Sequence, residues 1–209
     1  MRTRVNHRED RIIRGASAAL CLDFANTLAY RGSAPVEELQ TFDELVAWCV
    51  CAGVLETEEA ALRRVWGAAH QKLAATIFDD AIALREALYR IFAPAGTSEA
   101  DEDLKLLNHA LRATPARDMI ERDVGDRGDF GWRIEGPPAT MTELLAPILW
   151  SAGDLLTGQL LGRVRVCANP DCLWLFLDDS KGGARRWCSM QACGNRAKAR
   201  RHYLRHKVG

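Results

Sequence analysis

The chain has few features of a membrane protein, of a secreted protein or of a common enzyme. Its 209 residues contain no uninterrupted apolar run near the roughly 18 residues that a membrane-spanning helix needs. No apolar segment typical of a secretory signal follows the charged start MRTRVNHREDRIIRG. The catalytic patterns HExxH, GxSxG, GxGxxG and the P-loop are also absent. We therefore expect a cytoplasmic protein that does not bind membranes and is not an enzyme.

A net charge of zero conceals two parts of opposite charge. From residue 160 onward the chain has eleven Lys or Arg and three Asp or Glu, a charge of +8, which leaves −8 for residues 1–159. An acidic body joined to a basic end is typical of a protein with a polyanionic partner. A basic end that is simply solvated is the alternative. We also expect the two parts to attract each other, so that the body partly covers the basic end.

Hydrophobic periodicity predicts a mainly α fold for the first 160 residues. The predicted helices are one capped by Thr41 and Glu44 and ended at Gly53, one capped by Thr57, one opened by Asp79 or Asp80 and ended at Pro94 and Gly96, one opened by Ser98 with Asp101, and one from Thr140 to Gly158 that is kinked or restarted at Pro147. A short hairpin is expected around Gly125–Gly128. Because Trp48, Trp66 and Trp150 lie at helical spacing among aliphatic residues, we expect them to pack into one core.

Four of the seven cysteines form two pairs with the same spacing. Cys167 and Cys172 form one C-x4-C pair, and Cys188 and Cys193 form another after fifteen intervening residues. Pairs of this kind in a reducing compartment are typical of a structural zinc ion held by four thiolates. Buried free thiols and redox pairing of the cysteines are the alternatives that the spacing leaves open. Four thiolates would complete a tetrahedral site, so no position would remain for a catalytic water.

The residues around the two pairs predict a small zinc finger. Leu173–Leu177 is a β-prone apolar run and residues 178–183 are polar, which together predict a hairpin that leads to the second pair. The second pair then opens a helix. A knuckle, a hairpin and a helix that carries the last ligands make up a treble-clef finger. We therefore expect a multihelical domain over residues 1–160 and a four-cysteine, treble-clef-like zinc finger over residues 161–209, with one structural zinc ion.

Several motifs carry a resemblance to known families. Cys193-Gly194-Asn195-Arg196 resembles the motif that names the CGNR zinc-finger family. Further residues stand where that family has them: Cys167, Asn169, Cys172, Phe176, Asp178, Ser180, the run Arg185–Met190 and Lys198. Leu20–Leu28 and Leu45–Trp48 are similar to parts of the ABATE-type domain that accompanies this finger. The resemblance implies a stress-responsive transcription regulator, with a helical N-terminal domain and a treble-clef-like finger that binds DNA.

The basic residues near the C-terminus supply a candidate DNA-binding surface. The candidate contacts are Arg185, Arg186, Asn195, Arg196, Lys198, Arg200, Arg201 and Arg205. On a helix, Arg196, Arg200 and Lys207 would form one basic row and Lys198, Arg201 and Arg205 another. Ala197 and Leu204 would form a narrow seam between the rows, which we expect to dock on the hairpin, and Arg185 and Arg186 would extend the basic patch. The rows would contact phosphates, and Asn195 and Arg196 would lie where side chains reach base edges. The alternatives are a turn or metal-supporting role for Asn195 and packing at the rim of the finger for Arg186.

Three functions fit these observations. The first is sequence-selective DNA binding, with the helical domain acting as a sensor or as the unit that forms a homodimer. The second is a zinc-dependent module that binds RNA or another protein. The third is an enzyme with its active site in the helical domain. The candidate pocket for a small-molecule effector consists of Asp23, Asn26, Arg31 and Trp48. For Asp23 and Asn26 the alternative is hydrogen bonding at a turn or a helix end.

Overall fold

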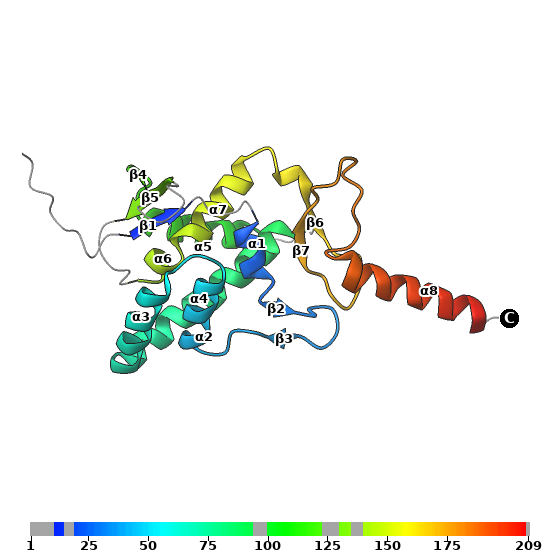
Figure 1. Cartoon of the computed structure of the whole chain (residues 1–209), viewed down its shortest axis with the longest axis horizontal. Helices are drawn as coiled ribbons and strands as arrows, with labels where there is room; N and C mark the ends of the chain where they lie inside the picture. Colours follow the sequence, from blue (N-terminus) through cyan, green and yellow to red (C-terminus); the bar gives the residue numbers. More distant parts are fainter. Residues whose placement is uncertain (1–10, 15–18, 94–99, 123–129, 135–139, 208–209) are drawn as a thin grey trace, which may run out of the picture.

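The computed structural model describes residues 11–14, 19–93, 100–122, 130–134 and 140–207, with the backbone alone for 11–14, 100, 201, 202 and 204–207. These residues form a helical body and a smaller C-terminal unit from which the last helix projects (Figure 1). The helices are α1 (Leu20–Ala25), α2 (Phe42–Cys51), α3 (Thr57–Ala69), α4 (Gln71–Phe92), α5 (Ala100–Ala113), α6 (Met141–Leu144), α7 (Ala146–Thr157) and α8 (Asn195–Lys207). The strands are β1 (Arg11–Arg14), β2 (Leu28–Ala29), β3 (Val36–Glu37), β4 (Ile120–Arg122), β5 (Phe130–Ile134), β6 (Val164–Val166) and β7 (Leu175–Leu177).

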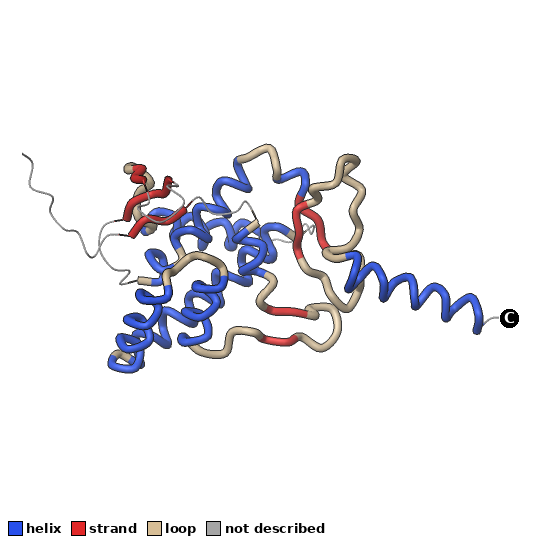
Figure 2. The backbone as a smooth tube through the Cα atoms, in the orientation of Figure 1, coloured by secondary structure: helices blue, strands red, loops and turns tan. Residues whose placement is uncertain are grey.

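The short helix α1 lies at the centre of the body and packs against α4 and α7. Its Leu22 and Phe24 are fully buried. Helix α4 adds Leu84 and Leu88, one turn apart on its buried face, and α7 adds Leu149. Figure 2 shows these helices gathered together, with the β6–β7 pair at one side. The predicted mainly α fold is therefore confirmed.

The predicted helix after Thr41 is confirmed as α2. The Thr41 hydroxyl accepts a hydrogen bond from Glu44 N at 3.2 Å. The Glu44 carboxylate accepts a hydrogen bond from Gln40 N at 2.6 Å. A capping box would have it accept from Thr41 N, so its partner is one residue earlier than predicted. The helix ends at Cys51, two residues before Gly53. Gly53 has a φ of 70°, in the left-handed region that favours glycine.

Two predicted helix starts are wrong. Thr57 is the first residue of α3, and Glu56 occupies the cap position. Helix α4 begins at Gln71, well before Asp79 and Asp80, which lie within it. A buried stripe of small and apolar residues continues toward the N-terminus of α4 and holds its first turns against the body. Acidic residues alone therefore did not mark the start of this helix.

The other predicted helix limits have mixed outcomes. Pro94, Gly96 and Ser98 lie outside the described residues, and α4 and α5 flank them. The predicted restart near Pro147 is confirmed, because α6 ends at Leu144 and α7 starts at Ala146. Thr140 forms a capping box with Glu143 at the start of α6.

The hairpin predicted before α6 is confirmed as the antiparallel pair β4–β5, and its turn lies outside the described residues. Strand β1, which the sequence analysis does not predict, completes a sheet of order β1-β5-β4. Trp150 packs with Ile134 and Trp132 of this region in a small second core. Trp48 and Trp66 pack on the main core, so the prediction of one core for all three tryptophans is wrong for Trp150.

The C-terminal unit is joined to the body through buried contacts of β7. Leu175 is buried and belongs to the main core. Its carbonyl accepts from Asn26 Nδ2 at 2.8 Å, and its N–H donates to Asn26 Oδ1 at 2.9 Å. The side-chain amide thus pairs with β7 as a neighbouring strand would. Gly32 also lies so close that a Cβ there would be 1.7 Å from the Pro170 carbonyl oxygen, so only glycine fits.

Helix α8 extends away from the β6–β7 pair as an arm (Figure 1). The predicted docking of an Ala197 and Leu204 seam on the hairpin is therefore wrong for most of the helix: Ala197 is partly buried near its start, and the Leu204 side chain lies outside the described residues. The expected partial covering of the basic end by the acidic body stays a prediction, because the side chains of Arg201, Arg205 and Lys207 lie outside the described residues. Among the side chains that the structure describes, no ion pair joins Lys198 or Arg200 to an acidic residue.

Candidate metal centre and basic surface

The first cysteine pair lies in the turn between β6 and β7. Cys167 N donates to Trp174 O at 2.8 Å, and Cys172 N donates to Asn169 O at 2.9 Å. These bonds close a tight knuckle that brings both thiols to one side. The predicted hairpin is placed wrongly, because β7 pairs with β6, which precedes the first cysteine pair, and not with a strand after residues 178–183.

The second cysteine pair approaches from the other side. Cys193 lies in a π-helical turn, Met190–Gly194, that leads into α8. The Ser189 side chain caps this turn by accepting from Ala192 N at 3.3 Å. The predicted order of a knuckle and then a helix whose first turn carries the last ligand is thus confirmed. The sequence does not reveal that the segment before α8, Met190–Gly194, is π-helical.

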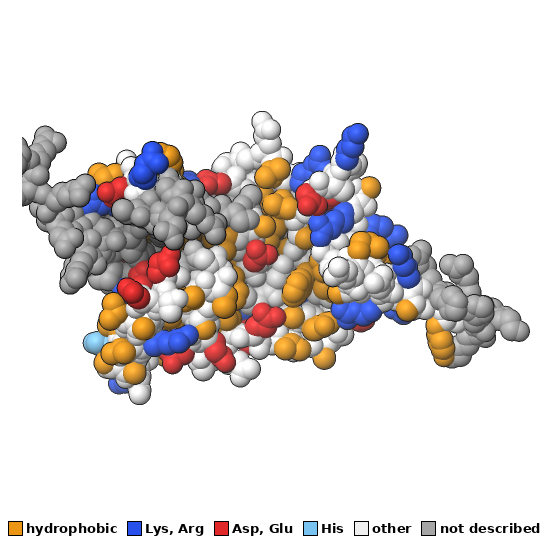
Figure 3. Space-filling view, viewed as in Figure 1, with side chains coloured by type: hydrophobic (Ala, Val, Ile, Leu, Met, Phe, Trp, Pro, Cys, Tyr) orange, Lys and Arg blue, Asp and Glu red, His pale blue; other side chains and the backbone are white. Residues whose placement is uncertain are grey.

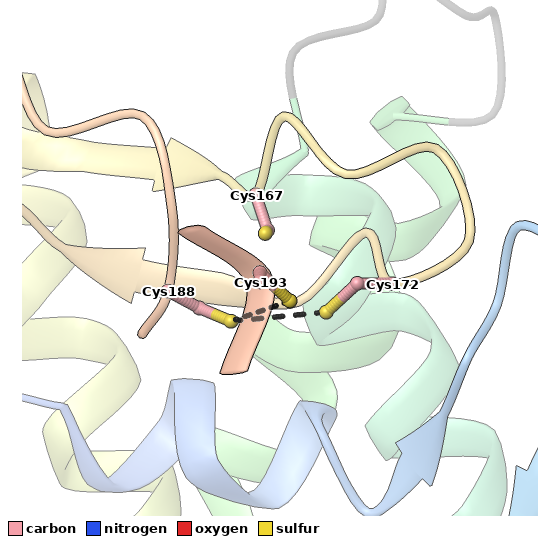
Figure 4. Close-up of side chains that lie close together, drawn as sticks. All are labelled: Cys167, Cys172, Cys188 and Cys193. Carbon is pink, nitrogen blue, oxygen red and sulfur yellow. Dashed lines mark hydrogen bonds between the residues drawn. The ribbon is translucent and has the colours of Figure 1, made fainter. Parts of the chain in front are cut away.

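The four thiols form one compact cluster. Their sulfur atoms all lie within 4.8 Å of one another. Cys188 Sγ is 3.7 Å from Cys172 Sγ and 3.8 Å from Cys193 Sγ (Figure 4). Zn–S bonds of ~2.3 Å in a tetrahedron place neighbouring sulfurs about 3.8 Å apart. The spacing of the thiols therefore fits a zinc ion at their centre.

The electrostatics of the cluster also favour a bound cation. Burial raises the pKa of the Cys172 thiol to about 11 and raises that of Cys188 further. Burial also opposes ionisation of Cys193, but hydrogen bonds from Asn169 and from the neighbouring cysteines outweigh it and lower the Cys193 pKa. The Asn169 amide nitrogen lies 3.5 Å from Cys193 Sγ. A bound zinc ion would compensate the charge of four thiolates in this buried place.

Arg185, a predicted DNA contact, is engaged inside the finger. Its Nε donates to Trp187 O at 3.0 Å, its Nη1 to Asp179 at 3.0 Å, and its Nη2 to Cys188 O. The guanidinium also lies over the Phe176 ring, 4.9 Å from the centroid. These contacts tie the loop before the second cysteine pair to the hairpin. We therefore interpret Arg185 as a residue that supports the metal centre.

Asp178 supports the same loop and was singled out in the sequence only as part of the family pattern. It is buried and accepts from Ser180 N at 3.0 Å and from Arg185 N at 2.9 Å. Hydrogen bonds from Ser180 hold the pKa of Asp178 below its usual value. The carboxylate thus fixes a polar loop that has no apolar core of its own.

Three of the predicted DNA contacts converge at one place. Arg186, Arg196 and Arg200 line a pocket of about 420 Å³ together with Trp187. The knuckle residues Asn169, Pro170 and Asp171 and the helix residue Ala197 complete the lining. In Figure 3, Lys and Arg side chains gather over the finger and the start of α8, whereas acidic side chains are spread over the body. The finger therefore has a hollow with a strongly positive lining.

Arg196 joins this pocket to the metal centre and to the body. Its Nη2 lies 4.0 Å from Cys193 Sγ, and its guanidinium is 5.7 Å from the Tyr30 ring centroid. A hydrogen bond with Tyr30 and the negative charge at Cys193 raise the pKa of Arg196. Tyr30 and Trp187 were not identified as site residues in the sequence. For Trp187, its place in the family-like run Arg185–Met190, directly before Cys188, is a signal that could have suggested it.

The remaining predicted contacts lie elsewhere on α8. Asn195 Nδ2 donates to Gln191 O at 3.2 Å, a bond within the turn that favours the alternative interpretation for this residue. Lys198 is exposed, and it lies on a different side of the helix from Arg196 and Arg200. The side chains of Arg201 and Arg205 lie outside the described residues.

The candidate effector residues do not form one pocket. Asp23 and Asn26 line the same cavity between the body and the finger. Arg31 instead forms an ion pair with Glu86 at 2.7 Å, and Trp48 packs against Phe24 with ring centroids 5.3 Å apart. The two amide bonds to β7 make Asn26 a structural link, as the alternative interpretation expects.

Comparisons with known proteins agree with this architecture. Residues 18–159 match the ABATE family, described as "Putative stress-induced transcription regulator", and residues 163–206 match the CGNR zinc finger. A comparison with curated proteins finds no match. Both matching families are of regulator or zinc-finger type and are not enzyme families. In the described part of the chain, no helix is long and apolar enough to span a membrane. The chain belongs to the ABATE family and carries a CGNR zinc finger whose four cysteines, Cys167, Cys172, Cys188 and Cys193, fit one structural zinc ion.

Proposed function

We propose that the protein is a DNA-binding transcription regulator whose zinc finger presents its arginine-lined pocket to the phosphate backbone. The observation that carries this proposal is the convergence of Arg186, Arg196 and Arg200 around one hollow. Arginine side chains bind phosphate through paired N–H donors, and several of them around one hollow suit a single phosphate group. The zinc ion would fix the knuckle and the start of α8, and so keep the three arginines in place.

The projecting helix supplies a second part of the proposed surface. Lys198 and Arg200 are exposed near the start of α8, where the helix leaves the body. A basic helix that stands clear of the body can enter a groove while the pocket holds the adjacent backbone. Trp187 beside the pocket offers an aromatic face, which also suits the unpaired bases of RNA or single-stranded DNA. An RNA-binding module is therefore the second candidate function.

The helical body would serve as the regulatory part in this proposal. We assign residues 1–160 to sensing or to dimerisation and residues 161–209 to nucleic-acid binding, with no catalytic role for either. A homodimer would place two fingers on paired half-sites. The protein would act in the cytoplasm, where thiols stay reduced and available to zinc.

The test is a salt titration of binding to duplex DNA by the full zinc-loaded chain. Arg200→Ala should weaken binding to all duplexes and reduce the slope of log K against log salt by about one unit, because one phosphate contact is lost. Arg64→Ala is the matched control, because Arg64 is an exposed arginine on α3, away from the finger. If Arg196 reads a guanine edge, Arg196→Ala should cost ~1 to 3 kcal/mol on the preferred duplex and little on scrambled DNA.

The same experiment separates the candidate functions. A uniform loss for Arg196→Ala would make it a phosphate contact like Arg200. Stronger binding to single-stranded RNA than to any duplex would favour the RNA module. Unchanged binding by both arginine variants, with zinc content intact, would contradict the proposed surface.

A further inference from the structure

The outer side of α3 is an apolar stripe that nothing in the described part of the chain covers. The exposed residues of this stripe are Ala61, Leu62, Val65, Ala68 and Ala69, which recur at helical spacing. Leu62 is 69% exposed and Val65 is 72% exposed, the highest values among the described large apolar side chains. The opposite side of α3 packs on the body through Ala60, Trp66 and Gly67. Helix α3 therefore has two apolar sides, of which the body uses one, and the other is typical of a surface that contacts a protein.

The stripe has an acidic residue at one end and a basic residue at the other. Glu58 lies in the first turn of α3, on the same side of the helix as Val65. Lys72 lies in the first turn of α4, just beyond the end of α3. Both of these charged side chains are exposed. Arg63 and Arg64 lie beside the stripe by helical spacing, so this side of α3 carries no charge after Glu58.

This arrangement is complementary to itself when the helix is reversed. In a dimer with two-fold symmetry, residue i of one copy contacts residue j of the other, and j contacts i. We consider two α3 helices that pair antiparallel, with both copies of Val65 at the axis. The facing pairs are then Ala61 with Ala69, Leu62 with Ala68, and Glu58 with Lys72 of the second copy. Each leucine lies against a small alanine, which favours close packing. A parallel pair would instead place Glu58 against Glu58, so the charges favour the antiparallel one.

We propose that the outer stripe of α3 is the surface through which two copies of this chain form a homodimer. Pairing buries Leu62 and Val65, the most exposed large apolar side chains that the structure describes. Glu58 and Lys72 stay at the rim, so the pairing removes no charge from water. A helix of 13 residues is about 20 Å long, so the interface is smaller than the roughly 800 Å² per partner of a standard complex. We therefore expect a reversible dimer with a Kd in the micromolar range.

The position of α3 leaves the zinc finger free in this dimer. In Figure 1, α3 lies near one end of the long axis of the molecule, and the finger with α8 lies at the other end. Figure 3 shows apolar side chains over the end that α3 forms. Both metal centres and both basic helices therefore lie outside the contact surface. The inference names a surface for the dimerisation that the proposed function assigns to the body. It does not require nucleic-acid binding and its test uses no nucleic acid, so the two can fail separately.

The first test measures self-association of the zinc-loaded full chain by sedimentation equilibrium, from about 1 to about 500 μM protein. Val65→Asp should raise the Kd of the dimer at least about a hundredfold, because two carboxylates would meet at the axis of an apolar contact. Val36→Asp is the matched control, because Val36 is 51% exposed and lies on β3, away from α3. Since Val65 is exposed in the single chain, Val65→Asp should keep the zinc content of the parent. A monomer at every concentration, or an unchanged Kd in Val65→Asp, would overturn the proposal.

The second test reverses the charges at the two ends of the stripe. Glu58→Lys and Lys72→Glu each turn both end contacts into like-charge pairs, so each variant alone should dimerise about tenfold more weakly than the parent. Mixed in equal amounts, the two variants should form a heterodimer with about the Kd of the parent, because every end contact again joins opposite charges. One chain with both changes should recover in the same way. A mixture that associates no more tightly than either variant alone would show that Glu58 does not face Lys72 of a second copy.

Discussion

The helical body and the zinc finger are held together by different chemistry. The body buries aliphatic side chains of α1, α4 and α7, such as Leu22, Leu84 and Leu149. The core of the finger consists of the cysteine cluster with Phe176 and two partly buried tryptophans. A unit this small with so little apolar content needs a metal ion for most of its stability. Yet Leu175 places one finger residue in the core of the body.

This comparison shows that the finger relies on two sources of stability. Zinc holds the knuckle to the start of α8, whereas Leu175 and the Asn26 amide hold β7 to the body. Tyr89 adds a further bond from α4, since its hydroxyl donates to Leu173 O at 2.9 Å. Removal of the metal should therefore disturb the body as well, and a change in the shared core should affect the retention of zinc.

The largest effect is expected from the loss of a zinc ligand. Cys193→Ser should lower the zinc content from about one ion per chain, measured by elemental analysis, and should unfold the finger. Because β7 contributes to the body core, we also expect a lower Tm for the body. Cys51→Ser is the control, since Cys51 is exposed on α2 and lies outside the cluster. Full zinc occupancy in Cys193→Ser would remove this residue from the ligand set.

The sequence predicts those parts of the fold that local patterns determine. Thr41 at the start of α2 and Pro147 near the start of α7 mark helix limits through their own backbone chemistry. The start of α4 at Gln71 depends on packing against the body, which no cap residue announces. The pairing of β6 with β7 depends on contacts between strands on either side of the knuckle. Such contacts are set by tertiary structure and not by the β-prone run alone.

For the site, the sequence reveals the metal ligands better than their surroundings. The repeated spacing of Cys167, Cys172, Cys188 and Cys193 predicts one cluster, and the structure brings the four thiols together. A basic residue can bind DNA or a carbonyl group of its own chain, so sequence alone did not separate Arg185 from Arg186. Similarly, nothing local indicates that Asn26 pairs with Leu175, which lies 149 positions away.

An intermediate effect is expected at the shared core. Leu175→Ala and Leu84→Ala each remove a fully buried leucine and should each lower the free energy of unfolding by about 2 to 5 kcal/mol. Only Leu175→Ala should also speed the transfer of zinc to a chelator, because Leu175 belongs to the finger as well as to the body. The measurements are urea unfolding and zinc release in native buffer. Equal rates of zinc release in the two variants would show that the shared core does not support the metal centre.

The smallest effect is expected in the ion-pair network beneath the finger. Glu86 accepts from Arg31 at 2.7 and 3.0 Å and from Arg85 at 2.9 Å. Burial works against its ionisation, but the bonds from these two arginines outweigh burial and lower the Glu86 pKa. Arg31 in turn lies 3.9 Å from the ring centroid of Tyr89, the residue that holds Leu173. The carboxylate thus supports the body side of the junction.

A carboxyl with a lowered pKa stabilises the fold above its ordinary pKa of 4.5, and this contribution is lost as the pH falls through its folded value. At neutral pH, Glu86→Gln should therefore lower the free energy of unfolding by about 2 kcal/mol, less than a fully buried pair because Glu86 is 28% exposed. The difference from the parent protein should shrink below about pH 4.5. Glu38→Gln should behave in the opposite way, because the Glu38 pKa is raised and its ionisation destabilises the fold at neutral pH. The measurement is the free energy of urea unfolding of each variant and of the parent at several pH values. All three proteins lose zinc in acid, so the difference between variant and parent removes that shared effect. A pH-independent loss in Glu86→Gln would assign its role to packing and not to charge.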